Sequence, residues 1–268
     1  MHAAAPPRAN KRLGQHFLID QNIVRKILAA AELGPQDVVL EIGPGRGILT
    51  QALSRAVRRV IAVEIDPALH RHLQEQQKEW SNVELICADA LQFPLDGLPV
   101  ETVVVANLPY YISTPLLFRL LEQRPRFPRM VLMLQREVAD RLIARPGSAD
   151  YGVLSVMAQY AADITKAFHV SAQCFRPRPE VGSAVVLLRT RPRGDASPEE
   201  ESKFAAFVKA AFAHRRKTLV NSLRDEGYEQ RRVMAAVDRL RLSPNVRAET
   251  LSLAHLKDLV RWLEDEQL

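Results

Sequence analysis

Short apolar runs rich in β-branched residues recur along the first half of the chain, at 38–42, 60–63, 83–87 and 102–106. Their first residues are separated by 22, 23 and 19 positions, which leaves room for a crossover helix or a long loop between most pairs. This spacing is typical of a parallel sheet with helices on its faces. Three further strands are predicted, and they span 130–134, 164–170 and 184–189.

Helical periodicity fills several of the intervals. Apolar positions at helical spacing predict a helix over 20–31 with Asp20 as its cap, and a short helix over 137–143. Another helix follows the fourth apolar run, where Ser113 or Thr114 can cap and Pro115 suits the first turn. The chain from residue 11 to residue 190 is therefore predicted to form one α/β domain.

The rest of the chain is helical in pattern. Residues 191–197 have the composition of a linker, and 1–10 that of a disordered tail. A capping box then opens a new helix, with Ser197 as cap, Pro198 at the first position and Glu200 at the third. Further helical patterns cover 218–224, 229–240 and 253–263. Residues 198–268 are thus predicted to form a small all-helical domain.

The candidate functional residues lie at the ends of the predicted strands, where open α/β sheets bind ligands. Gly43, Gly45 and Gly47 follow the first strand and allow a sharp turn with close approach to a ligand. Their spacing is neither the dinucleotide fingerprint nor a phosphate-binding P-loop. Glu64 ends the second strand, where a carboxylate can accept both ribose hydroxyls, and Asp89 after the third can accept from an adenine amine. Each acid alone is also a common turn residue, but together the three features outline a nucleoside site.

The fourth strand runs into Asn107-Leu108-Pro109-Tyr110. The Asn107 amide oxygen and the Leu108 carbonyl can accept the N–H groups of an exocyclic amine, and the Tyr110 ring can stack on a flat base. Pro109 fixes the turn and brings no competing N–H. Taken alone, the motif is also compatible with a turn that buries its tyrosine.

The order of these motifs resembles the adenosylmethionine-dependent methyltransferases and, more narrowly, the bacterial small-subunit rRNA adenine N6,N6-dimethyltransferases. The matching segments are 12–18, 41–47, 107–115, 134–138, 151–156, 175–181, 183–185 and 214–219, which span nearly the whole chain from Lys11. Two positions depart from the pattern, since His16 and Tyr111 stand where many relatives have asparagine.

The resemblance implies a Rossmann-like seven-stranded sheet with an inserted antiparallel strand, and S-adenosylmethionine as cofactor. It implies cofactor contacts from a set of pocket residues, and it implies that Phe175 covers the second face of the target base. It also implies dimethylation of two adjacent adenosines near the 3′ end of 16S rRNA, with a role in subunit biogenesis. The implied cofactor contacts, to which Gly45 is added from the loop, are His16, Leu18, Gly43, Glu64, Asp89 and Asn107.

Composition agrees with a nucleic-acid partner. The net charge is +6, and the first 26 residues carry five basic side chains against one acid. The two cysteines have no metal spacing, and no apolar run is long enough to span a membrane, so we expect a cytoplasmic protein without a metal site. The resemblance further implies 16S rRNA within the small subunit as the partner, and we expect the protein to be a monomer. Candidate RNA contacts are Arg8, Lys11, Arg12, Arg176, Arg178, Arg215, Arg216 and Lys217, of which the last three also fit a solvated helix end.

Two other functions remain open at this stage. One is the antibiotic-resistance methyltransferase that modifies an adenine of large-subunit rRNA, which shares the first domain. The other is a non-catalytic nucleic-acid-binding factor built on the same fold. The intact glycine loop with Asn107 and Tyr110 favours an active enzyme, and segment 214–219 favours the small-subunit family.

Overall fold

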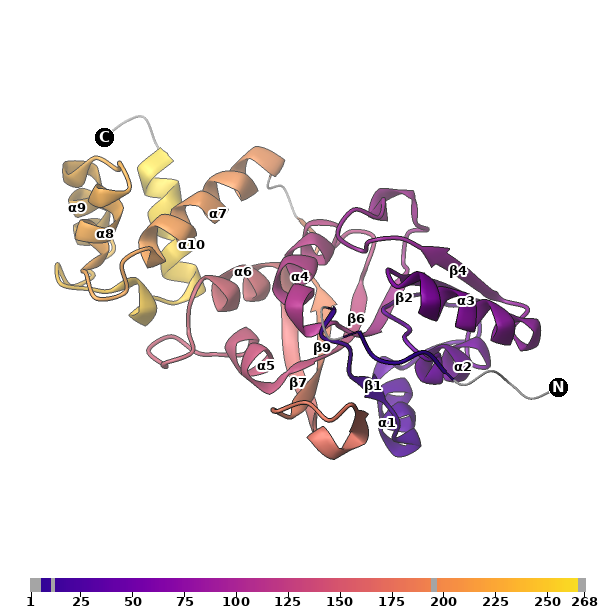
Figure 1. The fold of residues 1–268 in the computed structure, drawn as a ribbon. Helices are drawn as coiled ribbons and strands as arrows, with labels where there is room; N and C mark the ends of the chain where they lie inside the picture. Colours follow the sequence, from indigo (N-terminus) through magenta and orange to yellow (C-terminus); the bar gives the residue numbers. More distant parts are fainter. Residues whose placement is uncertain (1–5, 11–12, 194–196, 265–268) are drawn as a thin grey trace. The chain divides into compact units, whose positions relative to one another are not determined.

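The computed structural model describes residues 6–10, 13–193 and 197–264. The chain forms two compact units (Figure 1). The first takes in the chain up to residue 139 together with residues 162–192. The second takes in residues 140–161 and the chain from residue 193 onward. Each unit has its own hydrophobic core and is described by itself below.

The first unit is built on a seven-stranded sheet with the strand order β4-β3-β2-β5-β6-β9-β7. Strands β4, β3, β2, β5 and β6 are mutually parallel, and β9 lies antiparallel between β6 and β7. The predicted fold class, including the inserted antiparallel strand, is confirmed. The strands are β2 (Val38–Ile42), β3 (Arg59–Glu64), β4 (Val83–Cys87), β5 (Val103–Asn107), β6 (Arg129–Gln135), β7 (Ala162–Val170) and β9 (Ser183–Thr190).

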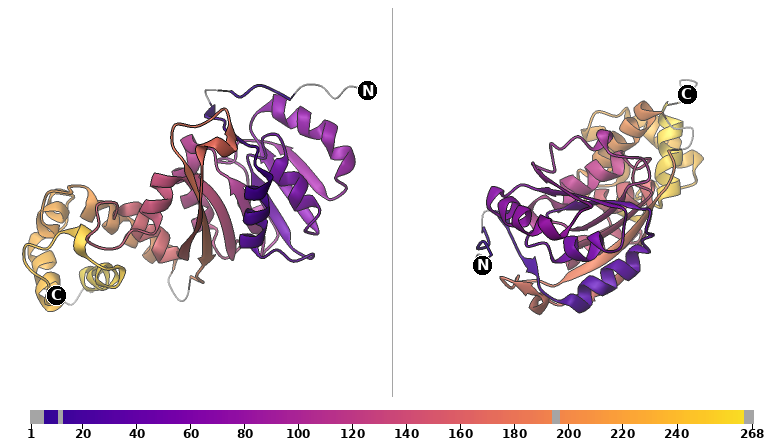
Figure 2. Two further views of the ribbon diagram at one scale, coloured as in Figure 1. Left: turned by 90° about the horizontal axis from the view of Figure 1, so that it is seen from below. Right: turned by 90° about the vertical axis from the view of Figure 1, so that its right-hand side faces the viewer.

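Helices lie on both faces of this sheet (Figure 2). On one face, α1 and α2 pack over Val39, Val105 and Met133 within a single apolar cluster. Side chains alternate along a strand, so neighbours such as Leu40 and Val104 point the other way and are also fully buried. The helices of this part of the chain are α1 (Gln21–Ala31), α2 (Ile48–Ser54), α3 (Pro67–Gln76), α4 (Ser113–Glu122) and α5 (Arg136–Leu142).

The sequence analysis missed a second, very small sheet. Strand β1 (Phe17–Leu18) pairs antiparallel with β8 (Phe175–Arg176), so that Leu18 faces Phe175 across the pair. The two strands are two residues long and come from opposite ends of the unit's sequence. This pairing holds the N-terminal segment 13–18 beside the carboxyl ends of the large sheet, where it lines the cavity described below.

The start of α4 differs from its prediction. Neither Ser113 nor Thr114 caps this helix, because α4 begins at Ser113 itself with Ile112 in the cap position and no side-chain cap bond. The chain enters α4 from a single helical turn, Tyr110–Ile112, so the backbone is already wound when the helix begins. The Ser113 hydroxyl instead donates back to the Tyr110 carbonyl at 3.2 Å.

The second unit consists of helices around one apolar core. The predicted capping box is confirmed, because Ser197 and Glu200 exchange side-chain-to-backbone bonds at the start of α7. Residues 140–161 also belong here, whereas the sequence analysis placed them in the first domain; Tyr151 and Val156 are buried in the core of the helical unit. Its helices are α6 (Val153–Ala161), α7 (Pro198–Phe212), α8 (Leu219–Asp225), α9 (Gln230–Arg239) and α10 (Leu253–Glu264). No described helix has both the length and the apolar character of a membrane span.

Candidate active site

A cavity opens in the first unit where β2, β3 and β5 end. Its wall combines the N-terminal segment 13–18, the glycine loop after β2, the end of β3, and the turn after β5. All the predicted cofactor residues except Asp89 line it, together with the Asn107 to Tyr110 motif. The topology thus brings together residues that lie up to 98 positions apart between Leu13 and Tyr111.

The glycine loop has the backbone conformation that its sequence predicts. Gly43, Gly45 and Gly47 all have positive φ angles, of 68°, 61° and 81°. At Gly47, which caps α2, an added Cβ would also lie 2.8 Å from Leu73 and 2.9 Å from Trp80. The loop is therefore closed to side chains at this point, and its backbone can approach a ligand closely.

Glu64 ends β3 with its side chain buried beneath this loop. Its Oε2 accepts from the Gly45 amide at 3.1 Å, and its Oε1 accepts from the Asp66 amide at 2.9 Å. Burial raises the pKa of this carboxyl above its ordinary value. Each oxygen keeps a second lone pair, so the group can still accept ribose hydroxyls. Asp66 caps α3 through a bond from the Ala68 amide at 2.9 Å.

Glu41 is a second buried acid at the cavity, and the sequence analysis gave it no role. It is 1% exposed on β2, and its Oε2 has no hydrogen-bond partner. Burial, reinforced by the nearby charge of Glu64, raises its pKa to about 8. The acidic residue before a glycine loop was visible in the sequence, but its burial was not.

Asp89 lines a smaller cavity that adjoins the first one. Its Oδ1 accepts from the Leu91 amide at 2.9 Å, so the residue closes the turn after β4. Gly43, Glu64, Ile65, Pro109 and Tyr111 line both cavities. The two acids predicted for the nucleoside thus line neighbouring cavities with shared walls: Glu64 lines both, and Asp89 lines the smaller one.

Asn107 lies at the end of β5, and the two polar atoms of its side-chain amide differ in their hydrogen bonding. Its Nδ2 donates to the His16 carbonyl at 3.4 Å, which fixes the orientation of the amide. Its Oδ1 is buried and has no hydrogen-bond partner among the described residues. His16 in turn bonds through Nδ1 to the Pro177 carbonyl at 2.8 Å. The side chain therefore presents a preoriented acceptor at the cavity wall.

Tyr110 is held in place from two sides. Its hydroxyl shares a 2.7 Å hydrogen bond with Ser183 on β9, and burial raises its pKa. The His16 ring lies beside it, with the ring centroids 5.4 Å apart. The sequence analysis did not find Ser183 as a partner, because its contact is made only once β9 is inserted next to β6. The bond fixes the tilt of a ring that is predicted to support a base.

Phe175 does not stand where the resemblance implies. Its side chain has no exposed surface and belongs to the hydrophobic core. The pairing with Leu18 turns it inward, away from the cavity lining. The structure thus does not bring Phe175 to the cavity, and its role as a second platform for the target base stays a prediction.

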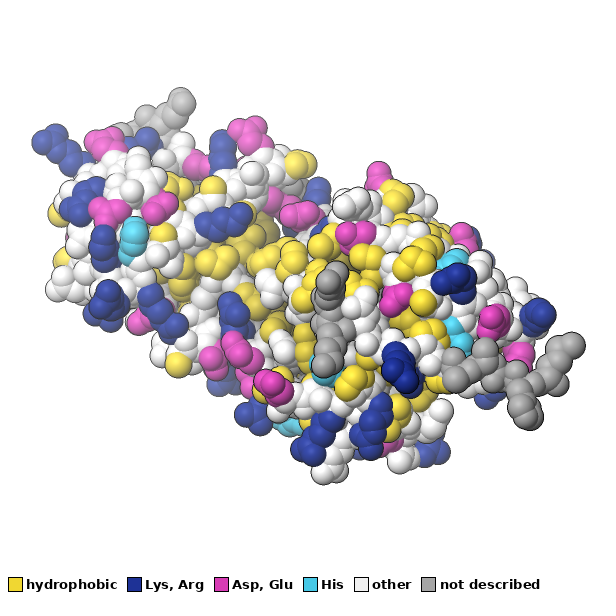
Figure 3. Space-filling model, in the orientation of Figure 1, with side chains coloured by type: hydrophobic (Ala, Val, Ile, Leu, Met, Phe, Trp, Pro, Cys, Tyr) yellow, Lys and Arg dark blue, Asp and Glu magenta, His cyan; other side chains and the backbone are white. Residues whose placement is uncertain are grey.

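The residues of the first unit that are predicted to contact RNA are only partly covered by the structure. Arg8, Arg176 and Arg178 are exposed, and Arg176 also donates to the backbone carbonyls of Gln173 and Phe175. Lys11 and Arg12 lie outside the described residues. Dark blue Lys and Arg side chains gather along the lower edge of the first unit, around α1 (Figure 3). This basic surface remains a prediction for RNA.

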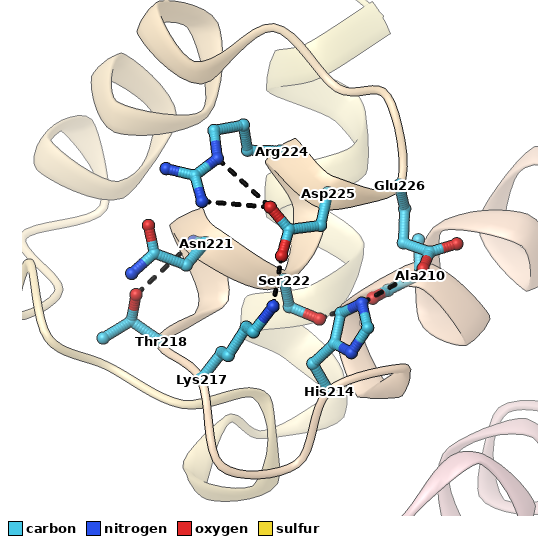
Figure 4. A network of polar contacts seen from close by, with 9 residues as sticks. All are labelled: Ala210, His214, Lys217, Thr218, Asn221, Ser222, Arg224, Asp225 and Glu226. Carbon is cyan, nitrogen blue, oxygen red and sulfur yellow. Dashed lines mark hydrogen bonds and ion pairs between the residues drawn. The ribbon is translucent and has the colours of Figure 1, made fainter.

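The basic segment of the second unit is largely engaged with its own acids (Figure 4). Lys217 pairs with Asp225, and His214 lies 3.4 Å from Glu226. Arg215 pairs with Glu249 at 3.0 Å and also donates to the Ala149 carbonyl. Arg216 is exposed and has no polar partner among the described residues. Of the three predicted contacts here, only Arg216 presents an uncompensated charge.

The fold and the cavity together define the class of protein to which this chain belongs. A parallel sheet with an inserted antiparallel strand, a glycine loop after β2 and acids after β3 and β4 is the framework of an S-adenosylmethionine-dependent methyltransferase. No cluster of His, Cys, Asp and Glu suited to a metal ion occurs among the described residues.

Comparison with known proteins narrows this class. The family model "Ribosomal RNA adenine dimethylase" matches residues 7–265, so the chain belongs to this family. It is an rRNA adenine dimethyltransferase, and its cofactor is S-adenosylmethionine.

Relatives and solved structures agree with this assignment. The chain is 44% identical to "Ribosomal RNA small subunit methyltransferase A" of Moorella thermoacetica over 95% of this chain and 92% of that protein. It is 43% identical to the protein of the same name from Pelotomaculum thermopropionicum, over 96% and 91% of the two chains. A dimethyladenosine transferase from Plasmodium falciparum superposes with a TM-score of 0.81 at 26% identity, over 91% and 96% of the two chains. The 23S rRNA methyltransferase ErmE superposes with a TM-score of 0.71 at 29% identity, over 93% and 100%.

Proposed function

We propose that this enzyme dimethylates N6 of two adjacent adenosines near the 3′ end of 16S rRNA, within the small ribosomal subunit. The observation that carries the acceptor chemistry is the buried, unpartnered Oδ1 of Asn107 at the cavity wall. The choice of the small subunit follows the names of the relatives at 39–44% identity. A contribution to subunit biogenesis follows from the same substrate.

The cofactor is placed by the acids at the strand ends. Glu64 takes the ribose hydroxyls with its remaining lone pairs, and Asp89 accepts from the adenine amine in the adjoining cavity. The amides of the glycine loop, with His16 and Leu18, line the remaining wall. The cofactor supplies a methyl group on a positively charged sulfur, which is an electrophile without further activation.

Asn107 acts on the acceptor nitrogen. Adenine N6 is a poor nucleophile because its lone pair is delocalised into the ring. Its N–H groups donate to Asn107 Oδ1 and to the Leu108 carbonyl, which localises the lone pair and aligns it with the methyl group. The N6 lone pair forms the new bond to carbon, the old carbon–sulfur electron pair stays on sulfur, and the N–H proton leaves to solvent. A second round on the same nitrogen gives the dimethylated base.

Tyr110 supports the target base. Its ring is oriented by the hydroxyl bond to Ser183, so it offers a fixed face on which the adenine stacks after leaving its own stack in the RNA. Stacking of this kind contributes roughly 1–3 kcal/mol per base.

We further propose that the enzyme acts as a monomer in the cytoplasm, where ribosomal subunits assemble. The residues proposed for both substrates lie within the first unit of one chain, so the site requires no second copy.

The substrate is tested with separated ribosomal subunits that lack the modification. Labelled S-adenosylmethionine is incubated with each subunit, and we expect four methyl groups per small subunit and none in the large subunit. Label in the large subunit alone would instead support methylation of 23S rRNA, the activity that gives ErmE its name. No label in either would favour a non-catalytic factor.

A further inference from the structure

Tyr111 occupies a position that the proposed chemistry does not use. It lines both the main cavity and the smaller cavity around Asp89, so it stands at their junction. The ring is 47% exposed, unlike that of Tyr110, which is anchored to Ser183. No described residue forms a hydrogen bond with its hydroxyl. A partly exposed aromatic ring thus lies beside both nucleoside acids, where the two cavities share their lining.

The surroundings of this ring suit a flat, neutral ligand. Ile65 follows Glu64 directly, lines both cavities as well, and is another large exposed apolar side chain. Pro109 contributes a further apolar surface shared by the two cavities. The apolar side chains of Tyr111, Ile65 and Pro109 therefore line the space next to two carboxylates. Glu64 is suited to bind a ribose, and Asp89 is suited to bind an amine. A purine ring would cover apolar surface that the ligand-free protein leaves in water.

Tyr111 lies close enough to Asp89 and Glu64 for the charges of both acids to act on its phenol. Burial raises the pKa of its phenol, and the charges of Asp89 and Glu64 raise it further. Its ring edge also faces the N-terminal segment, since a Cβ at Gly14 would lie 3.9 Å from its Cδ1. The ring thus lies between the strand-end acids and the segment that closes the cavity.

We propose that Tyr111 is a cofactor-binding residue whose ring stacks on the adenine of S-adenosylmethionine, between Glu64 and Asp89. The ring then holds the nucleoside half of the cofactor in the cavity while Asn107 and Tyr110 handle the acceptor. This inference rests on the proposed roles of Glu64 and Asp89, and it is independent of which RNA is methylated.

The test compares two ligands that share adenosine. Affinities for S-adenosylhomocysteine and for 5′-methylthioadenosine, which lacks the amino-acid part, are measured by calorimetry for the parent protein and for Tyr111→Ala, Tyr111→Phe and Tyr111→Leu. We expect Tyr111→Ala and Tyr111→Leu to weaken both ligands by the same factor, roughly 5- to 100-fold. Tyr111→Phe keeps the aromatic face and is expected to stay near the parent affinity. Val100→Ala, at an exposed position outside both cavities, serves as the control.

Three results would overturn the proposal. Unchanged affinity in Tyr111→Ala, with a raised KM for RNA, would assign the ring to the acceptor. Equal losses in Tyr111→Phe and Tyr111→Ala would assign the effect to the hydroxyl. A loss confined to S-adenosylhomocysteine would place the ring at the amino-acid end. Thermal unfolding checks each variant, and if Tyr111→Ala does not fold, the comparison of Tyr111→Leu with Tyr111→Phe decides. None of these outcomes bears on the choice of ribosomal subunit.

Discussion

A buried polar atom without a hydrogen-bond partner costs a protein about 1–3 kcal/mol, and the Oδ1 of Asn107 is such an atom. A bound substrate that donates a hydrogen bond to this atom would offset the cost. Asn82 offers a contrast within the same chain, because its amide donates to the carbonyls of Ser54 and Val57 at 2.9 and 2.8 Å. One asparagine therefore stabilises the fold, and the other is positioned for chemistry.

This contrast gives a prediction for two matched variants. Asn107→Ala is expected to lower kcat for methyl transfer at least about 100-fold, as when a preorganised hydrogen-bonding group is removed from other active sites, with an almost unchanged free energy of unfolding. Asn82→Ala is expected to lose roughly 1–3 kcal/mol of stability and to keep its kcat. Activity assays and urea unfolding measure the two effects. Retained activity in a folded Asn107→Ala would contradict the acceptor role.

Glu41 gives a prediction about pH. Its pKa rises to about 8 in the folded chain from 4.5, so between these values the unfolded chain releases a proton that the native protein keeps. The unfolded state then binds fewer protons, and the free energy of unfolding falls as pH rises, by at most roughly 1.4 kcal/mol per unit. Glu41→Gln removes this pH-dependent contribution to the free energy of unfolding. The stability of Glu41→Gln relative to the parent should therefore increase from pH 5 to pH 8, whereas parallel profiles in urea unfolding would show that Glu41 ionises normally.

Which residues were predictable depends on how local their signals are. Gly43, Glu64 and Asn107 could be placed because each sits at a strand end that the apolar pattern marks. Ser183 and Phe175 could not, since the contact with Tyr110 and the inward turn of the phenylalanine depend on strand pairings between distant segments. A family resemblance assigned Phe175 a role that its burial does not support.

At the scale of elements, strands were predicted more completely than the small pieces between them. The seven strands of the main sheet carry apolar runs, most of them with several β-branched residues, and each predicted range overlaps the observed strand. The two-residue strands β1 and β8 carry no periodicity at all. Helix α6 (Val153–Ala161) was not predicted, because five of its nine residues are buried and little amphipathic pattern remains.

The junction of the glycine loop with α2 gives an element-scale prediction. Gly47 and Gly227 have similar φ angles, of 81° and 93°, but only Gly47 has neighbours that a Cβ would meet. Gly227→Ala should cost the left-handed strain alone, about 1–2 kcal/mol. Gly47→Ala should cost a further ~1–3 kcal/mol, because Leu73 and Trp80 must move, and it should also weaken cofactor binding. Equal losses of stability in the two variants would show that the packing at Gly47 is not tight.

At the scale of the whole molecule, the positive charge is the main feature relevant to RNA. Affinity for rRNA should fall steeply with salt, because each phosphate contact releases a counterion. Arg216 is exposed and uncompensated, whereas the charge of Arg215 is compensated by Glu249. Arg216→Ala should therefore reduce the slope of log affinity against log salt by about one, and Arg215→Ala by less. The reverse order, measured by filter binding to small-subunit rRNA, would remove Arg216 from the RNA surface.

The central claim is that this cavity transfers methyl groups to adenine N6 of small-subunit rRNA. Nucleoside mass spectrometry of rRNA methylated by the purified enzyme, with the modified positions mapped by nuclease fragments, tests it most directly. The account predicts N6,N6-dimethyladenosine at two adjacent positions near the 3′ end of 16S rRNA, absent with Asn107→Ala. Methyl groups on a ring nitrogen, on another base or only in large-subunit rRNA would contradict it.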